Sequence, residues 1–328
     1  MSNTTLAQAR AKLAELMSQH QGSPVAEASL CAVASGASGR VIMRCESMVG
    51  VYWTDERADN NSFLPAAKSL YRAGLRVPKI LSEWTDGQGL GACLMTDLGT
   101  RDILSYRSCT WTELKAIYQR AFESLLPLYQ LSPDWELQPA FDADYYRWEQ
   151  HYFAEHLLAT HAQLEPTRIQ SLLEATSPMA SYLAALPRVP VHRDCQSQNI
   201  MMMAEQAWLI DFQGMRMGRM EYDLASLIYD PYMDLDAEQR QQLLQLWQHL
   251  SGQPLDMSIF VACGIQRLMQ ALGAFANIGH HQQRAWYLEQ IPAGLRALHQ
   301  LIELAPVAST AYQFAQQLRP CLNDVKSQ

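Results

Sequence analysis

Apolar residues recur with the spacing of strands in the first hundred residues and with the spacing of helices afterwards. Five short apolar runs in the first part predict β-strands, the first two joined by a Ser/Gly-rich turn. These runs are residues 28–34, 40–45, 48–53, 79–84 and 92–95. Residues 1–20 and 61–73 predict helices, the second ended by Gly74. Its buried side is predicted to carry Phe63, Leu64, Ala67, Leu70 and Tyr71.

The rest of the chain is predicted to be mostly helical. From Trp111 to Tyr129, apolar residues recur every three or four positions, as in a long buried helix. Further helical segments are residues 144–158, 237–252, 257–277, 284–304 and 310–322, with another helix opening after Gly218. No internal repeat is evident among them.

A polar segment after the apolar run 189–191 carries the candidate chemistry. It reads His192-Arg193-Asp194-Cys195-Gln196-Ser197-Gln198-Asn199, and the short apolar run 208–210 then ends on Asp211. The oxygens of Asp194, Asn199 and Asp211 are ligands that Mg²⁺ prefers, usually with substrate phosphates completing its shell. Taken singly, such residues are ordinary turn formers or helix caps.

This order of residues resembles the catalytic loop and metal-binding turn of the kinase superfamily. The segment 192–199 matches the pattern H-R-D-x-x-x-x-N, and the segment 211–213 stands where D-F-G is expected. The resemblance implies that Asp194 orients an acceptor hydroxyl and takes its proton. It also implies that Asn199 and Asp211 hold Mg²⁺ against the phosphates of ATP.

Three residues are expected to support the loop. The resemblance implies that His192 and Arg193 brace it, and that Asp223 accepts hydrogen bonds from its backbone N–H groups. The alternative for Asp223 is an acid in the first turn of a helix, where the helix dipole favours it. Cys195 adjoins Asp194, but it stands at a variable position of the kinase loop pattern, so we do not expect it to act as a nucleophile.

The resemblance implies that the nucleotide binds to the first part of the chain. Residues of the hairpin turn, Ser35, Gly36 and Gly39, would then cover its phosphates. Residues 94–99 resemble the hinge of such kinases, so Met95 and Asp97 would meet the adenine. The third strand lacks the lysine that kinases direct to the phosphates, and no lysine lies between Lys12 and Lys68. Either Arg40 or Arg44 substitutes, or the nucleotide is held differently, or activity is lost. The helix 61–73 also lacks the glutamate that normally pairs with this lysine.

Within the superfamily the chain is most similar to aminoglycoside-phosphotransferase-like kinases, because helices replace the activation segment of protein kinases. Four local features narrow the resemblance: the lysine-free third strand, Val77-Pro78 before the next strand, Asp97-Leu98-Gly99, and Arg147-x-Glu149 with Phe153. In these the chain resembles bacterial anomeric sugar kinases that act on N-acetylmuramate and N-acetylglucosamine. The resemblance implies an α+β, bilobal, protein-kinase-like fold, with a small antiparallel-sheet N-lobe (residues 1–97) and a larger, mostly helical C-lobe (residues 98–328). Arg147 and Glu149 are candidates for reading the acceptor, or else belong to a solvated helix face. Gln213 departs from the usual turn glycine.

The composition and net charge of the chain indicate which classes of binding partner to expect. The chain has 328 residues, 48% of them hydrophobic, and a formal net charge of -8, so it can bury a sizeable core and repels a polyanion. We therefore expect no nucleic-acid partner. The seven cysteines form no C-x-x-C pair, which favours a reducing cytoplasm. No apolar run is expected to span a bilayer, and the oligomeric state is left open.

Three activities compete. The first is a small-molecule kinase that uses ATP and Mg²⁺ to phosphorylate a hydroxyl of an amino sugar, or of an aminoglycoside or choline-type acceptor. The second is a catalytically inactive kinase fold that binds a nucleotide or a protein, which the missing lysine suggests. The third, a protein kinase, ranks last for want of an activation segment.

Overall fold

The computed structural model describes residues 3–33 and 39–326 and divides into two compact units. The first unit comprises Met1–Arg101, Ser132–Gln138 and Met201–Met215. The second comprises Asp102–Leu131, Pro139–Ile200 and Arg216–Gln328. The first unit thus takes two segments from later in the chain. The simple lobe boundary near residue 97 stays a prediction.

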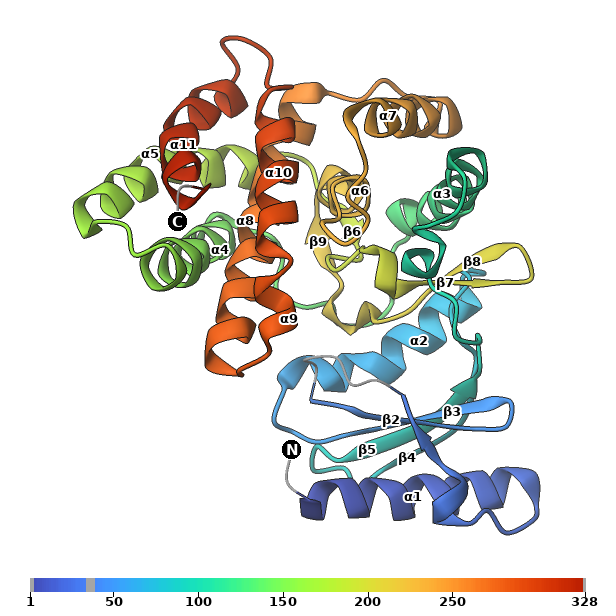
Figure 1. Cartoon of the computed structure of the whole chain (residues 1–328). Coiled ribbons are helices and arrows are strands. Elements are labelled where there is room, and N and C mark those ends of the chain that lie inside the picture. Colours follow the sequence, from blue (N-terminus) through green and yellow to red (C-terminus); the bar gives the residue numbers. More distant parts are fainter. Residues whose placement is uncertain (1–2, 34–38, 327–328) are drawn as a thin grey trace. The chain divides into compact units, whose positions relative to one another are not determined.

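A five-stranded antiparallel sheet forms the centre of the first unit (Figure 1). Its strands lie in the order β1 (Cys31–Ala32), β2 (Val41–Cys45), β3 (Met48–Trp53), β5 (Gly91–Thr96) and β4 (Ile80–Thr85). All five predicted strands are present. β1 is shorter than the predicted run because the 3-10 helix Glu27–Ser29 occupies its start.

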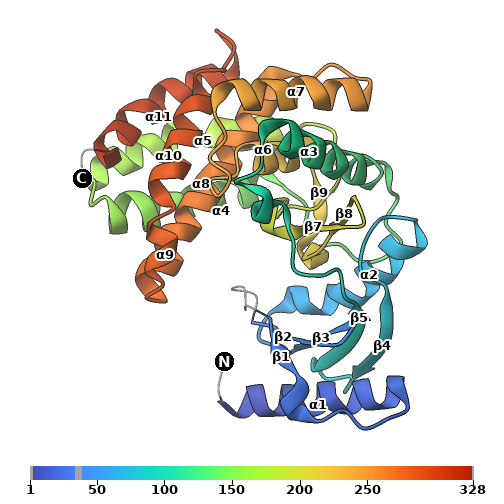
Figure 2. The ribbon, with the colours of Figure 1, turned by 45° about the vertical axis from the view of Figure 1, so that its right-hand side comes forward.

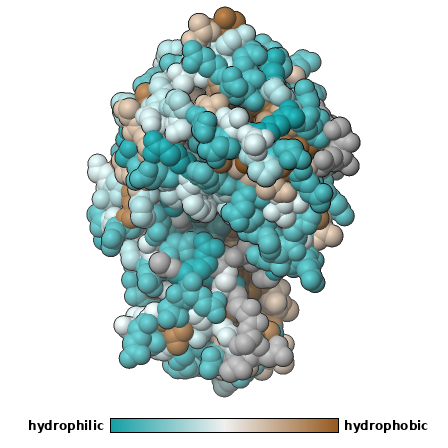
Figure 3. Space-filling view, turned by 90° about the vertical axis from the view of Figure 1, so that its left-hand side faces the viewer, coloured by the Kyte–Doolittle hydropathy of each residue, from teal (hydrophilic) through white to brown (hydrophobic). Residues whose placement is uncertain are grey.

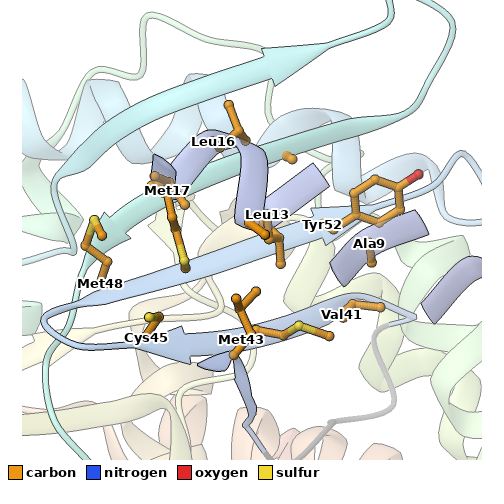
Figure 4. Packing of buried hydrophobic residues seen from close by; sticks show 13 residues of the cluster. Ala9, Leu13, Leu16, Met17, Val41, Met43, Cys45, Met48 and Tyr52 are labelled. Carbon is orange, nitrogen blue, oxygen red and sulfur yellow. The ribbon is translucent and has the colours of Figure 1, made fainter. Parts of the chain in front are cut away.

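Helix α1 (Asn3–Gln21) covers one face of this sheet, and its apolar side forms a core with the strands. Figure 4 shows Leu13 and Met17 pointing from α1 toward β2 and β3. The approach is close, because a Cβ added to Gly50 of β3 would lie 2.8 Å from Cδ2 of Leu13. Glycine is therefore required at this position by contact rather than by backbone conformation.

Helix α2 (Phe63–Arg72) lies on the opposite face of the sheet, as Figures 1 and 2 show. Phe63, Ala67 and Leu70 are buried as predicted, but Tyr71 is 45% exposed. The prediction for Tyr71 was wrong, because the buried side of α2 is centred on Ala66, Ala67 and Leu70. Gly74 follows the helix with a positive φ of 81°, which suits a glycine stop.

The second unit is mostly helical. Its helices are α3 (Trp111–Leu125), α4 (Ala143–Phe153), α5 (Pro166–Ala184), α6 (Met220–Ile228), α7 (Ala237–Ser251), α8 (Met257–His281), α9 (Ala285–Leu288), α10 (Ile291–Ile302) and α11 (Thr310–Lys326). α8 is central and packs against α4, α6 and α10 (Figure 2).

The predicted helices differ from the structure at three places. First, helix α5 was not predicted from the sequence. The predicted helix 284–304 is two helices, α9 and α10, with Pro292 in the first turn of α10. The predicted helix 144–158 is α4 followed by the π-helix Ala154–His161. At that junction α8 comes close, since a Cβ on Gly273 would lie 3.1 Å from the backbone of Phe153.

Helix α8 corrects the expectation that no apolar segment could span a bilayer. Among the described residues it is the one helix long and apolar enough to do so. However, 83% of its apolar stretch is buried inside the protein, as in a core helix. The face of the molecule in Figure 3 is mainly hydrophilic, with hydrophobic residues dispersed over it.

Two small antiparallel sheets carry the candidate chemistry. In the second unit, β6 (Val189–Val191) pairs with β9 (Arg216–Gly218). β7 (Ile200–Met203) and β8 (Gln206–Leu209) form a two-stranded sheet. The 3-10 helices Ser197–Asn199 and Phe212–Gly214 lie beside the two polar motifs.

Candidate active site

The polar loop after β6 has a strained backbone that a buried carboxylate holds in place. Arg193 has a φ of 76°, a left-handed conformation that costs a non-glycine residue roughly 1–3 kcal/mol. Asp223 of α6 accepts hydrogen bonds from the backbone N–H groups of His192, at 2.7 Å, and Arg193, at 2.8 Å. Burial raises the pKa of Asp223 to about 6, while these N–H groups favour its charged form. One carboxylate therefore fixes the loop just before Asp194.

Asp194 follows this strained residue with 29% of its side chain exposed. Burial raises its pKa, but the positive charges of Arg193 and Arg267 above all outweigh burial, so the pKa lies below its ordinary value. The side chain is therefore an anion at neutral pH. It can accept a hydrogen bond from a hydroxyl that reaches it.

Other contacts fix the remainder of the loop. Asp230 accepts a hydrogen bond from the backbone N–H of Ser197 at 2.8 Å. The side-chain amide of Asn199 donates from Nδ2 to the backbone oxygen of Asp194 at 2.8 Å, which orients Asn199. Arg267 of α8 donates from Nε to the hydroxyl of Ser226 at 2.9 Å.

A second buried carboxylate, Glu149 of α4, lies in the same unit. It has no exposed surface and accepts hydrogen bonds from the hydroxyl of Tyr222, at 2.8 Å, and from Nε2 of Gln266, at 3.0 Å. Burial raises its pKa to about 7. Arg147 instead donates to the hydroxyls of Ser177 and Ser181 on α5. The structure thus does not bring the two acceptor candidates together.

The turn that is predicted to bind metal belongs to the first unit. Asp211 has a positive φ of 63°, and its Oδ1 accepts hydrogen bonds from Nη2 of Arg40 and, at 3.1 Å, from Nε2 of Gln213. Arg40 also donates from Nη1 to Oε1 of Gln213 at 2.9 Å. Phe212 stacks on Phe63 of α2 with ring centroids 5.5 Å apart. The acid of the turn is therefore held by an arginine from the start of β2.

The predicted hinge carries a second arginine–aspartate pair. Arg44 of β2 contacts Asp97 through Nε, at 2.6 Å, and Nη2, at 2.9 Å. Asp97 also accepts from the backbone N–H of Gly99, and Met95 is half-buried in β5. Of the predicted phosphate-covering residues, Gly39 has a positive φ of 71°. Ser35 and Gly36 lie outside the described residues.

The chemistry of the donor set fits magnesium. Among the described residues nothing donates to Oδ2 of Asp211, and the Asn199 hydrogen bond uses only its amide nitrogen. Each unit therefore offers an oxygen of the kind that Mg²⁺ binds together with phosphates. In the described part of the chain no group of three or more His, Cys, Asp or Glu residues could hold a metal ion by itself.

Comparison with known proteins decides the family. A model described as "Phosphotransferase enzyme family" matches residues 32–257, which is more than half of the chain. The chain belongs to this phosphotransferase family. Similar curated proteins are the N-acetylmuramate/N-acetylglucosamine kinase of Pseudomonas aeruginosa, 26% identical over 309 residues and 90% of each chain, and that of Neisseria meningitidis. The latter is 28% identical over 250 residues, 71% of this chain and 74% of that protein.

Solved structures of kinases share the fold of this phosphotransferase. A choline/ethanolamine kinase family protein from Mesorhizobium loti matches with a TM-score of 0.64, 15% identity and coverage of 96% and 99% of the two chains. An aminoglycoside phosphotransferase from Streptomyces rimosus matches with a TM-score of 0.59, 16% identity and coverage of 82% and 99%. The predicted α+β kinase-like fold is thereby confirmed.

Sequence reasoning missed Asp230, which holds the loop, and Tyr222 and Gln266, which hydrogen-bond Glu149. All three lie in segments whose local pattern shows only a helix or its end. Arg267 did leave a signal, because it is the only Asp, Glu, Lys or Arg in the long apolar helix α8. A buried charge in such a helix requires partners, and here they include Ser226 of α6 and Gln270 of α8 itself.

Proposed function

We propose that this phosphotransferase moves the γ-phosphoryl group of ATP to a hydroxyl of an amino sugar such as N-acetylmuramate or N-acetylglucosamine. The observation that carries this proposal is Asp194, a partly exposed anion whose loop is fixed by Asp223. A carboxylate in that state suits a hydroxyl acceptor. The similarity to the curated sugar kinases, over 90% of the chain in Pseudomonas aeruginosa, supports the acceptor class.

The proposed reaction is in-line displacement. The acceptor oxygen forms a bond to the γ-phosphorus as the bond from that phosphorus to the β,γ-bridging oxygen breaks, and ADP leaves. Asp194 orients the hydroxyl and receives its proton. Because the pKa of Asp194 is lowered, it is a weak base, and we expect orientation to contribute more than proton removal before the transition state.

We propose that Asn199 and Asp211 hold Mg²⁺, which would neutralise charge on the β- and γ-phosphates. His192, Arg193 and Asp223 would keep the loop in its working conformation. Ser35, Gly36, Gly39, Arg44, Met95 and Asp97 are the proposed nucleotide-binding residues. ADP is present in the solved complex of the Streptomyces rimosus aminoglycoside phosphotransferase with streptomycin, which supports a nucleotide in this fold.

On the acceptor side, Arg147 and Glu149 stay proposals. Arg147 is half-exposed, so an acceptor can touch it directly. Glu149 has no exposed surface, so it would act on the acceptor only through its neighbours. The proposed compartment is the cytoplasm, where amino sugars and ATP occur together.

The test is turnover. The protein is incubated with ATP and Mg²⁺ over N-acetylated amino sugars, aminoglycosides and choline, and products are screened for the mass of one added phosphate. We expect phosphorylation of an N-acetylated amino sugar and its loss, by roughly 10²-fold or more, in Asp194→Asn. Tight ATP binding without turnover on any acceptor would favour the inactive binding module. Phosphorylation of choline or of an aminoglycoside alone would move the enzyme to those classes.

A further inference from the structure

Two features that differ from the kinase pattern both involve Asp211. The chain lacks the strand-3 lysine, and it has Gln213 where a glycine is expected. In the structure, an arginine and that glutamine both contact Asp211 and also contact each other. The departures therefore form one connected group of three side chains, Arg40, Asp211 and Gln213.

Arg40 is built into this group. Only 4% of it is exposed, its two terminal nitrogens are directed to Asp211 and Gln213, and its guanidinium carbon lies 5.4 Å from the ring centre of Phe63. Its Nε is buried, with no hydrogen-bond partner among the described residues. A guanidinium carries five N–H donors, so one contact from each terminal nitrogen leaves donors over for an anionic oxygen.

The same contacts explain how Asp211 keeps a free oxygen. Arg40 and Gln213 both donate to Oδ1, and within the described residues no donor reaches Oδ2. An acid anchored through one oxygen presents the other in a fixed direction, which suits a metal ligand. Phe63 packs on Arg40 from α2, the helix that lacks the glutamate of kinases, so an aromatic ring of this helix supports the cation.

Arg44, the other candidate for the missing charge, is committed elsewhere. Both Nε and Nη2 of Arg44 contact Asp97 at the predicted hinge, and its charge is balanced there. Arg40, which directly precedes β2, is thus the arginine that contacts Asp211.

We propose that Arg40 replaces the missing lysine: it binds the nucleotide's phosphates and, with Gln213, orients Asp211. This inference rests on the proposed use of a nucleotide and goes beyond it by assigning the cation. An arginine is suited to the role because its planar, always charged guanidinium can contact a carboxylate and a phosphate together.

The test measures binding rather than turnover. Wild type, Arg40→Lys and Arg40→Met are titrated with adenosine, ADP and ATP in the presence of Mg²⁺, by calorimetry. We expect Arg40→Met to lose roughly 10- to 100-fold in affinity for ADP and ATP, the usual value of a hydrogen bond to a charged group, with adenosine affinity unchanged. Arg40→Lys should recover part of the loss. The matched control is Arg72→Met, which removes an exposed arginine of the same unit that pairs with Asp134, and it should bind like wild type.

Unchanged ADP and ATP affinity in Arg40→Met would overturn the assignment, as would an equal loss of adenosine affinity. If Arg40→Met does not fold, Gln213→Ala decides: it removes a partner of Arg40 and should selectively weaken ADP and ATP by a few-fold. Equal binding by Gln213→Ala and wild type would then reject the proposal. Since no acceptor is present, a failed sugar assay does not affect this result, and a failure of wild type to bind any nucleotide rejects the proposed function itself.

Discussion

The carboxylate of Asp223 accepts a hydrogen bond from the backbone N–H of Arg193, a residue whose φ is 76°. The contact joins α6 to the loop that carries Asp194, across 30 residues of sequence. Without an acceptor at that point, the left-handed conformation has no compensation, and the loop would relax toward an ordinary backbone. The position of Asp194 therefore depends on Asp223.

Asp223→Asn tests this dependence. An amide has one acceptor oxygen in place of two, so one backbone N–H loses its partner, at a cost of roughly 1–3 kcal/mol in the free energy of unfolding. We expect kcat to fall by about 10²-fold while affinity for ADP is kept, because the proposed nucleotide-binding residues are in the other unit. Asp236→Ala, which removes only the cap of α7, is the control for lost stability. Wild-type kcat in Asp223→Asn would contradict the role of Asp223.

The candidate site residues that lie in short contiguous motifs could be predicted from the sequence. Asp194, Asn199 and Asp211 stand in a fixed order: the polar segment that carries Asp194 and Asn199 follows the apolar run 189–191, and Asp211 follows the apolar run 208–210. The contact of Arg40 with Asp211 spans 171 residues, and nothing in either segment indicates the pairing. The same limit applies to Glu149, whose helix pattern predicts a face but not its complete burial beneath Tyr222.

The strands were predictable for a similar reason. The run 48–53 is apolar throughout, and the run 79–84 lies between Val77-Pro78 and the turn residues Asp86-Gly87. The two runs match β3 and β4 closely. α5 was missed because its apolar positions are interrupted by polar residues and by Pro178 inside the helix. Tertiary contacts of α5 with α4 and α11 stabilise it, and these are not visible in a local window.

Arg267→Met should change the pH dependence of the reaction. Burial raises the pKa of Asp194, and the charges of Arg193 and Arg267 lower it further than burial raises it. Removing the charge of Arg267 therefore raises the pKa of Asp194, and Asp194 must be ionised to accept a proton. We expect the acid limb of the kcat profile to move to higher pH. Arg120→Met, which changes an exposed arginine of α3, is the control. Identical acid limbs in Arg267→Met and wild type would count against the electrostatic argument.

Substitution of the proposed metal ligands should change the requirement for magnesium. Asn199→Ala and Asp211→Asn are each expected to raise the free Mg²⁺ concentration for half-maximal activity by roughly tenfold or more, since even indirect support of a metal ligand contributes 10–100-fold. Asp86→Asn, in the loop between β4 and β5, serves as a surface control. Chelation should abolish wild-type activity, and added Mg²⁺ should restore it. An unchanged magnesium requirement in Asn199→Ala would remove that residue from the metal site.

The contact between Gly50 and Leu13 predicts a coupled pair of mutations. Gly50→Ala places a methyl group 2.8 Å from Leu13 Cδ2, and the resulting overpacking should cost about 1–3 kcal/mol. Leu13→Ala opens a cavity and should cost about 2–5 kcal/mol. In the double variant the new methyl group occupies space that Leu13 has left, so the loss should be smaller than the sum. Denaturant unfolding of the four proteins measures this coupling, and strict additivity would contradict the close approach of α1.

Glu149 should make the protein less stable as the pH rises from 5.5 to 7.5. Its pKa is raised by burial to about 7, above the ordinary 4.5, so the folded protein binds more protons than the unfolded chain in this window. A group of this kind contributes stability that is complete below pH 4.5 and is lost as the pH passes 7, a difference of roughly 2 kcal/mol across the window.

Glu149→Gln keeps an acceptor for Tyr222 and cannot ionise, so its stability should vary less with pH by that amount. Denaturant unfolding at both pH values provides the measurement, with Glu155→Gln, an exposed glutamate of the following π-helix, as the control. A pH dependence equal to that of wild type would show that Glu149 is already charged when buried, and that Tyr222 and Gln266 solvate it fully.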